Sequence, residues 1–419
     1  MTKKRPVLRK KLRALIAKAP YQKWAPLLFL SGVLLAVALT NIIKESPEKS
    51  SPPEALTFAN QSPTFSEVRD YLTALAQKKG ALYAYQTLRV MELPPNMDFH
   101  LLGHLVSDQI YKEKGINGMS YCTDDFRNAC SHAIVVGIFS EQGIEALPKI
   151  TEACRKAPGG SGAYSMCFHG LGHGILSYFG YQMEKAVPIC TKAGINPFPN
   201  QEATQCISGA VMEIISGGDH DREVWTKQHR HYLTDNPNPL SLCQSSYMPA
   251  EAAPLCFTYL TPYLFIAAGT NLGKPDPAYF KKAFSFCEAI PPTQRANREA
   301  CFGGFGKEFV VLVRQRDIRN MEQISDTELT QAYKWCQLAG NQEGITACIT
   351  HSISSLYWGG ENDVSGALRY CGIIGDEAQK SSCYRNLTSM VYYFQKSSTT
   401  RESFCRKLPD LYRINCGKV

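Results

Sequence analysis

Two histidine pairs share a pattern that suits metal binding. The segments Phe99–His104 and Phe168–His173 both read Phe-His-x-Leu-Gly-His. Each segment places two histidines four residues apart, His100 with His104 and His169 with His173. Residues at this spacing share one face of an α-helix, so both imidazoles of a pair can reach one ion. The pattern therefore predicts metal ligands on two helices.

Three further residues extend this candidate metal site. His132 lies two residues after a cysteine, the same offset as His169, which gives it an equivalent position between the two pairs. Asp108 lies one helical turn after His104 and offers an oxygen ligand or a partner for a ligand. Glu213 lies seven residues after Cys206, at a similar distance from the start of the next expected inner helix. The full set of predicted metal ligands is His100, His104, His132, His169, His173, Asp108 and Glu213.

Nitrogen and oxygen donors of this kind suit zinc, copper, iron or manganese. A non-covalent haem is the lesser alternative, and covalent attachment is not expected because the chain has no Cys-x-x-Cys-His segment. The His-Glu-x-x-His helix of zinc peptidases is also absent from the sequence. Hydrolysis, oxidation and metal storage remain open alternatives, and so does the question of whether the protein is an enzyme.

The elements that must position these residues are marked by 16 cysteines. A helical pattern precedes the first cysteine of each successive pair, loop residues follow it, and the second cysteine opens an apolar run that contains glycine. This arrangement predicts αα-hairpins in which a disulfide joins the end of one helix to the start of the next. The predicted disulfides join neighbours: Cys122–Cys130, Cys154–Cys167, Cys190–Cys206, Cys243–Cys256, Cys287–Cys301, Cys336–Cys348, Cys371–Cys383 and Cys405–Cys416.

The predicted fold class is therefore all-α, built from disulfide-stapled αα-hairpin repeats. Such repeats form either an open solenoid or a closed αα toroid whose second helices line a central funnel. Neighbouring inner helices of an open solenoid lie roughly 9–10 Å apart, which would place the two histidine pairs about 20 Å apart and on separate ions. Strong curvature would bring them together. Glycines near the starts of the second helices indicate close approach of either a neighbouring helix or a ligand: Gly137, Gly170, Gly172, Gly174, Gly209, Gly303, Gly304 and Gly306.

In this repeat plan the chain resembles disulfide-stapled αα-repeat proteins of the Sel1-like, tetratricopeptide-related type. The segment Cys122–Cys130, with seven residues between its cysteines, is the most similar part. The resemblance covers roughly residues 70–419 and concerns architecture alone. Longer loops and an uneven period depart from those families, so the resemblance implies no function and no functional residue.

The N-terminal region predicts where the protein resides. Nine of the 45 Lys and Arg residues lie in the first 24 positions, which leaves 36 basic residues against 37 acidic ones and argues against nucleic-acid binding. Residues 24–43 carry no charge and are long enough to cross a membrane as a helix, with the basic side cytoplasmic. The alternative is a signal peptide cleaved after Ala36-Val-Ala38. The predicted organisation is a basic cytoplasmic tail (1–23), a transmembrane anchor (24–43), a flexible linker (44–63) and an extracytoplasmic repeat domain (64–419).

These observations predict a single-pass membrane protein with a histidine-rich, metal-binding site on the inner helices of an extracytoplasmic repeat domain. The alternative function is a non-catalytic α-solenoid scaffold whose concave face binds a partner protein, peptide or glycan of the cell envelope.

Overall fold

In a computed structural model, the described residues are 53–123, 125–157, 160–195, 201–217, 221–359, 363–395, 397–413 and 416. They belong to one compact unit that starts at Pro53, within the range predicted as linker, and that already buries Ala55 and Phe58. The predicted tail and the predicted anchor at 24–43 lie outside the described residues. Within the described ranges, no helix combines the length and the apolar character that a membrane span requires.

The described residues form helices and contain no β-strand. An entry segment comprises η2 (Pro53–Leu56), α3 (Phe65–Lys79), α4 (Ala81–Val90) and α5 (Phe99–Lys114). The next elements are η3 (Gly115–Tyr121), α6 (Asp125–Gln142), η4 (Gly143–Ala146), α7 (Leu147–Arg155), α8 (Gly160–Tyr178), α9 (Met183–Ala193), α10 (Glu202–Ser216), α11 (Arg222–His229), η5 (Arg230–Thr234) and α12 (Ala253–Ala268). The remaining elements are η6 (Pro277–Tyr279), α13 (Phe280–Glu288), α14 (Arg295–Val313), η7 (Met321–Gln323), α15 (Asp326–Cys336), η8 (Gln337–Ala339), α16 (Gln342–Gly359), α17 (Ser365–Ile373), α18 (Glu377–Phe394), α19 (Ser398–Lys407) and α20 (Asp410–Arg413).

The two helices of a hairpin differ in how they are buried. The outer helix α13 buries Phe280, Ala283, Phe284 and Cys287, the spacing of one apolar helical stripe. Its inner partner α14 buries an almost continuous run from Ala300 to Gly306 and again from Phe309 to Leu312. A helix that is buried on most of its faces lies between neighbours, so the inner helices form the core to which the outer helices attach.

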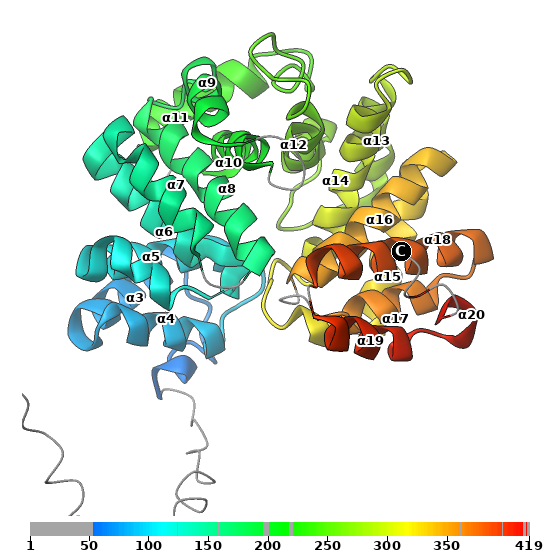
Figure 1. Ribbon diagram of the computed structural model, residues 1–419, viewed down its shortest axis with the longest axis horizontal. Coiled ribbons are helices and arrows are strands. Elements are labelled where there is room, and N and C mark those ends of the chain that lie inside the picture. Colours follow the sequence, from blue (N-terminus) through cyan, green and yellow to red (C-terminus); the bar gives the residue numbers. More distant parts are fainter. Residues whose placement is uncertain are drawn as a thin grey trace, which may run out of the picture. The chain divides into compact units, whose positions relative to one another are not determined.

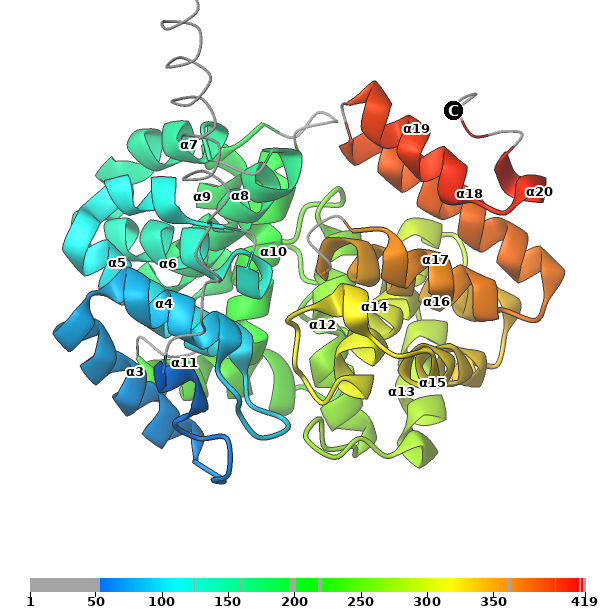
Figure 2. The ribbon, with the colours of Figure 1, turned by 90° about the horizontal axis from the view of Figure 1, so that it is seen from below.

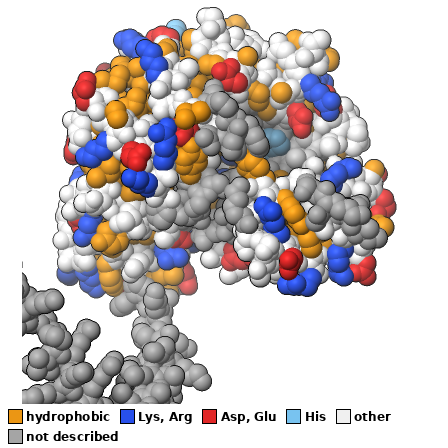
Figure 3. Space-filling view, viewed as in Figure 1, with side chains coloured by type: hydrophobic (Ala, Val, Ile, Leu, Met, Phe, Trp, Pro, Cys, Tyr) orange, Lys and Arg blue, Asp and Glu red, His pale blue; other side chains and the backbone are white. Residues whose placement is uncertain are grey.

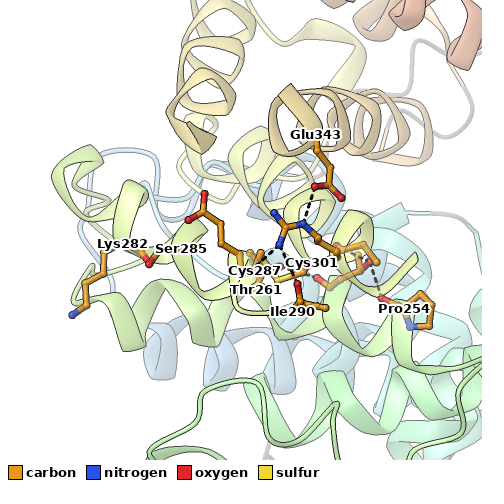
Figure 4. The surroundings of a disulfide bond; sticks show 12 residues. Pro254, Thr261, Lys282, Ser285, Cys287, Ile290, Cys301 and Glu343 are labelled. Atoms are coloured by element: carbon orange, nitrogen blue, oxygen red, sulfur yellow. Dashed lines mark hydrogen bonds and ion pairs between the residues drawn. A yellow bond between two sulfur atoms is a disulfide. The ribbon is translucent and has the colours of Figure 1, made fainter. Parts of the chain in front are cut away.

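All eight predicted disulfides are confirmed, each between neighbouring cysteines with Cα atoms 5.3–5.7 Å apart. Figure 4 shows Cys287–Cys301, which joins the end of α13 to α14 close to Ile290 and to Glu343 of the next hairpin. Arg298 links the same parts, since it donates to the Ile290 carbonyl and pairs with Glu343 at 2.7 Å. Disulfides in this number are typical of an oxidising, extracytoplasmic compartment.

Two hairpins depart from the predicted plan. Cys122 follows the 3₁₀ segment η3 instead of an α-helix, and its disulfide closes a short loop onto α6. The insertion before Cys243 forms α11 and the π-helical turn η5, and turns then lead to α12. The outer helix of a hairpin can therefore be replaced by an irregular segment where a disulfide holds that segment to the inner helix.

The inner helices pack in chain order. The helix α5 contacts α6, and contacts then run from α6 to α8, α10, α12, α14 and α16. Figures 1 and 2 show these hairpins following one another around a common centre, from the blue α3–α5 segment to the yellow α14. On the face shown in Figure 3, charged side chains of both signs alternate with hydrophobic ones over the described part of the surface.

The chain curves far enough for the segment after α14 to contact the start of α5. The amide of Asn96 donates to the Gln315 carbonyl at 2.8 Å, and Arg316 forms an ion pair with Asp98, the N-cap of α5. Arg319 donates to the Met91 carbonyl at 2.8 Å, and its guanidinium lies 3.6 Å from the Phe99 ring centroid. These contacts join residues more than 200 positions apart, so helices α5 to α14 surround a shared interior.

Close helix approach accounts for the glycines of the inner helices. A Cβ atom at Gly209 of α10 would lie 1.8 Å from the His169 carbonyl of α8, and one at Gly172 of α8 would lie 1.8 Å from the Cys206 carbonyl. No side chain fits at these distances. The backbones of α8 and α10 thus contact each other directly at the level of the predicted ligands.

Candidate metal centre

The structure gathers all five predicted histidine ligands into one cluster. The ring centroid of His132, on α6, lies 5.3–5.6 Å from the centroids of the other four imidazoles. The rings of His104 and His173, one from each pair, have centroids 5.8 Å apart. The spacing of about 20 Å expected for an open solenoid is therefore wrong, and the alternative of strong curvature holds. Helices α5, α6 and α8 converge on His132.

Three of these residues have the geometry of a metal site. Among the described residues, the ligand atoms of His100, His104 and His132 all lie within 4.8 Å of one another. The Nε2 atoms of His100 and His104 are 3.2 Å apart and share a hydrogen bond, in which Nε2 of His100 accepts because its proton is on Nδ1. Two imidazole nitrogens on a tetrahedral zinc are about 3.3 Å apart, so this pair is already spaced as two ligands of one ion.

The other ring nitrogen of His100 is held by a strained turn. His100 Nδ1 lies 2.6 Å from the carbonyl oxygen of Phe126, and because a carbonyl only accepts, Nδ1 carries the proton. Phe126, Arg127 and Asn128 all have φ between 54° and 64°, a left-handed conformation that costs such residues roughly 1–2 kcal/mol each. The Cys122–Cys130 disulfide closes this turn. The turn therefore fixes the His100 tautomer and leaves Nε2 to face the cluster.

His173 is oriented in the same way by a carboxylate. Its Nδ1 donates to Glu213 Oε2 at 2.8 Å, across the close contact between α8 and α10. Its Nε2 is buried and has no hydrogen-bond partner among the described residues. A carboxylate behind an imidazole is the usual arrangement for a metal-binding histidine, since it fixes the ring and makes the free nitrogen more basic. The structure thus places Glu213 behind a predicted ligand, His173.

His169 also directs one nitrogen to the protein and one to the cluster side. Ser208 Oγ donates to the Gln205 carbonyl at 2.7 Å, so it must accept from His169 Nδ1, which lies 2.9 Å away. His169 Nε2 then carries a lone pair and faces Met212 Sδ at 3.4 Å. A thioether has no proton to donate, so this nitrogen lone pair forms no hydrogen bond with the sulfur.

His132, at the centre of the cluster, has no hydrogen-bond partner for either ring nitrogen among the described residues, although its exposed fraction is 0%. Burial lowers the pKa of His132 and of His169 well below the usual value, and the neighbouring imidazoles act in the same direction. Burial also lowers the pKa of His100 to about 4. These rings are therefore neutral at pH 7, the protonation state in which imidazole binds a metal.

The cluster borders a cavity of about 190 Å³ between the inner helices. His100, His104, His132 and His173 line it, together with Asp108 and Glu213. Asp108 thus lies on the cavity wall one turn beyond His104, outside the group of three histidines. The structure places all seven predicted residues in or against this one region, and the three histidines that form the compact group come from α5 and α6.

Several residues at the cavity carried no signal in the sequence. Tyr259 reads as a core aromatic by its spacing, yet its ring lies 4.9 Å from His169 and beneath the Lys307 ammonium, and burial raises its pKa to about 12. Arg127 and Met212 also line the cavity and follow no motif. Glu308 is the exception, because it lies seven residues after Cys301 just as Glu213 lies seven residues after Cys206. This shared offset indicates that both belong to the same wall of the cavity.

Comparison with known proteins identifies no relative. No protein-family model matches the chain, and no curated protein or solved structure matches it either. The function must therefore be argued from the geometry of the cluster itself.

Proposed function

We propose that this protein is an extracytoplasmic metal-binding protein in which His100, His104 and His132 hold one transition-metal ion. The observation that carries the proposal is the hydrogen bonding of the cluster. His100, His169 and His173 each direct Nδ1 to a protein acceptor and Nε2 away from it, and His132 at the centre has no partner. Both ring nitrogens of His132 and Nε2 of His173 are buried without a partner among the described residues, which is costly unless a ligand pairs with them.

Three imidazoles suit zinc or copper, and iron or manganese would require oxygen donors such as Asp108 in addition. A tetrahedral ion with three protein ligands keeps one position open, and that position would face the cavity. There, an ion acts as a Lewis acid or lowers the pKa of bound water. A haem is less well accommodated, because the five rings pack against one another with no gap for a macrocycle between them.

The N-terminal sequence supports a location for this centre. Residues 24–43 would anchor the protein in the membrane with the basic tail in the cytoplasm, and residues 53–419 would lie on the opposite side. The disulfides support that side, because thiols are kept reduced in the cytoplasm. A partner protein, peptide or glycan of the envelope would then reach the domain from outside.

Elemental analysis of the full chain tests the metal proposal. The protein is made in an oxidising compartment without a polyhistidine tag, and its bound metals are measured before and after reconstitution with zinc or copper. We expect close to one ion per chain in the native protein and a loss of most of it in His132→Gln, which removes the central imidazole.

The matched control is His351→Gln, which replaces a partly buried histidine outside the cluster. This variant should retain the metal. Native protein that stays metal-free after reconstitution would contradict the proposal and would favour the scaffold function. If both variants lose metal equally, unfolding is the cause of the loss, and circular dichroism detects unfolding independently.

A further inference from the structure

The cavity beside the histidine cluster contains an arginine that forms no ion pair with another described residue. Arg127 belongs to the left-handed turn at the start of α6 and lines the cavity. Its Nη2 donates to Ser355 Oγ of α16 at 3.1 Å, while its Nε is buried and has no hydrogen-bond partner among the described residues. Burial lowers the pKa of Arg127, but an arginine retains its charge at neutral pH.

Other charges on the cavity wall already have partners. Asp98 pairs with Arg316, and Lys307 pairs with Glu308 at 2.5 Å. Glu213 accepts from His173. Glu308 is the acidic side chain whose charge acts on Arg127, but its oxygen is bound to Lys307. Among the described residues, no carboxylate forms an ion pair with Arg127, although Glu308 acts on its charge and Asp108 also lines the cavity. Buried charges are normally paired, which indicates an anion from outside the chain.

The rest of the cavity wall limits what that anion can be. Apolar side chains form much of the lining: Leu101, Leu105, Val136, Val311, Leu312 and Ile318. The cavity volume of about 190 Å³ lies below the range typical of drug-sized ligands. One guanidinium without an ion pair can pair with one negative charge, and its planar N–H groups match a carboxylate. A small molecule with one carboxylate and an apolar body therefore fits better than a dianion such as phosphate.

We propose that the cavity binds a small aliphatic monocarboxylate, whose carboxylate pairs with Arg127 and whose chain packs on the apolar wall. The contact with Arg127 needs no metal ion. Binding of the carboxylate does not depend on the proposed function. Its use does, because the same cavity would present the bound molecule to the open position of the metal centre. Ser355 is the positioning residue that holds the guanidinium in place.

Calorimetric titration of the full chain tests this site with hexanoate as the probe. Hexanamide has nearly the same shape without the charge, and inorganic phosphate represents a multiply charged anion. We expect hexanoate to bind the chelator-treated, metal-free protein at least about 10-fold more tightly than hexanamide or phosphate. Arg127→Gln should weaken hexanoate about 10- to 100-fold, and Ser355→Ala should weaken it several-fold. Arg127→Lys should retain part of the affinity.

The matched control is Arg298→Gln on α14, which removes an arginine that pairs with Glu343 outside the cavity and should leave hexanoate affinity unchanged. Equal binding of hexanoate and hexanamide, tighter binding of phosphate, or no effect of Arg127→Gln in folded protein would each overturn the proposal. Binding of hexanoate only to metal-loaded protein would also overturn it, while supporting the metal centre. Binding to a protein that takes up no metal would uphold this site and contradict the metal function.

Discussion

At the scale of single residues, the cluster is defined by which nitrogen of each imidazole the protein uses. A carbonyl, a hydroxyl and a carboxylate accept from the Nδ1 atoms of His100, His169 and His173. A set of structural histidines would satisfy both nitrogens within the protein, because buried polar atoms without partners cost free energy. Among the described residues, Nε2 of His173 and both ring nitrogens of His132 have no such partner. Burial lowers the pKa of His100, His132 and His169, so a metal does not compete with protons for these three rings at pH 7.

Burial of histidine also predicts how stability depends on pH. Burial lowers the pKa of His351 to about 4, and the nearby Lys307 acts in the same direction. In the unfolded chain this histidine titrates near 6.5. The folded state thus binds fewer protons between these two values, so stability is greatest above pH 6.5 and falls as the pH drops toward 4.

We expect His351 alone to contribute roughly 2–3 kcal/mol of this loss between pH 7 and 4.5. Urea unfolding of metal-free protein at both pH values measures it, with disulfides intact. His351→Gln removes the titrating group and should show a correspondingly shallower dependence on pH. Identical pH profiles for the two proteins would mean that folding does not lower the pKa of His351.

At the scale of elements, much of the plan could be predicted from the sequence. The cysteine pairs predict the disulfides because each joins neighbours in the chain, and the register of His132 and His169 relative to their cysteines predicts equivalent positions on inner helices. The left-handed turn at 126–128 could not be predicted, because non-glycine residues rarely adopt this conformation and only the tertiary structure holds them there. Arg127, which lies in this turn and lines the cavity, was missed with it.

Close packing of α8 and α10 gives a test at this scale. Gly209→Ala would place a Cβ atom 1.8 Å from the His169 carbonyl, so the helices must separate. We expect a destabilisation of about 1–3 kcal/mol or more in urea unfolding and a weaker metal site, since His173 moves away from Glu213. The matched control is Gly375→Ala, where no atom lies within 4 Å of the added Cβ and the φ angle is ordinary. Similar effects of both substitutions would contradict a specific role for the contact.

At the scale of the whole unit, the curvature of the hairpin series brings the two histidine pairs together, and this curvature could not be predicted from the sequence. Each hairpin turns by an angle that depends on how its side chains pack against the next hairpin, and small angles accumulate over the series. Contacts of Arg316 and Arg319 with the α4–α5 region then hold the curve. An open arrangement with the same hairpins and disulfides would keep the two histidine pairs apart. The histidine spacing alone therefore predicted ligands but not a shared centre.

X-ray absorption spectroscopy of the metal-loaded full chain tests most directly whether one ion is held by histidines from different hairpins. For zinc, we predict nitrogen or oxygen ligands at about 2.0–2.1 Å with an outer-shell pattern that requires three imidazoles, falling to two in His132→Gln. A spectrum fitted by two imidazoles or fewer in the native protein would contradict it. So would a spectrum that His132→Gln leaves unchanged, because the ion would then lie outside the cluster that the curvature assembles.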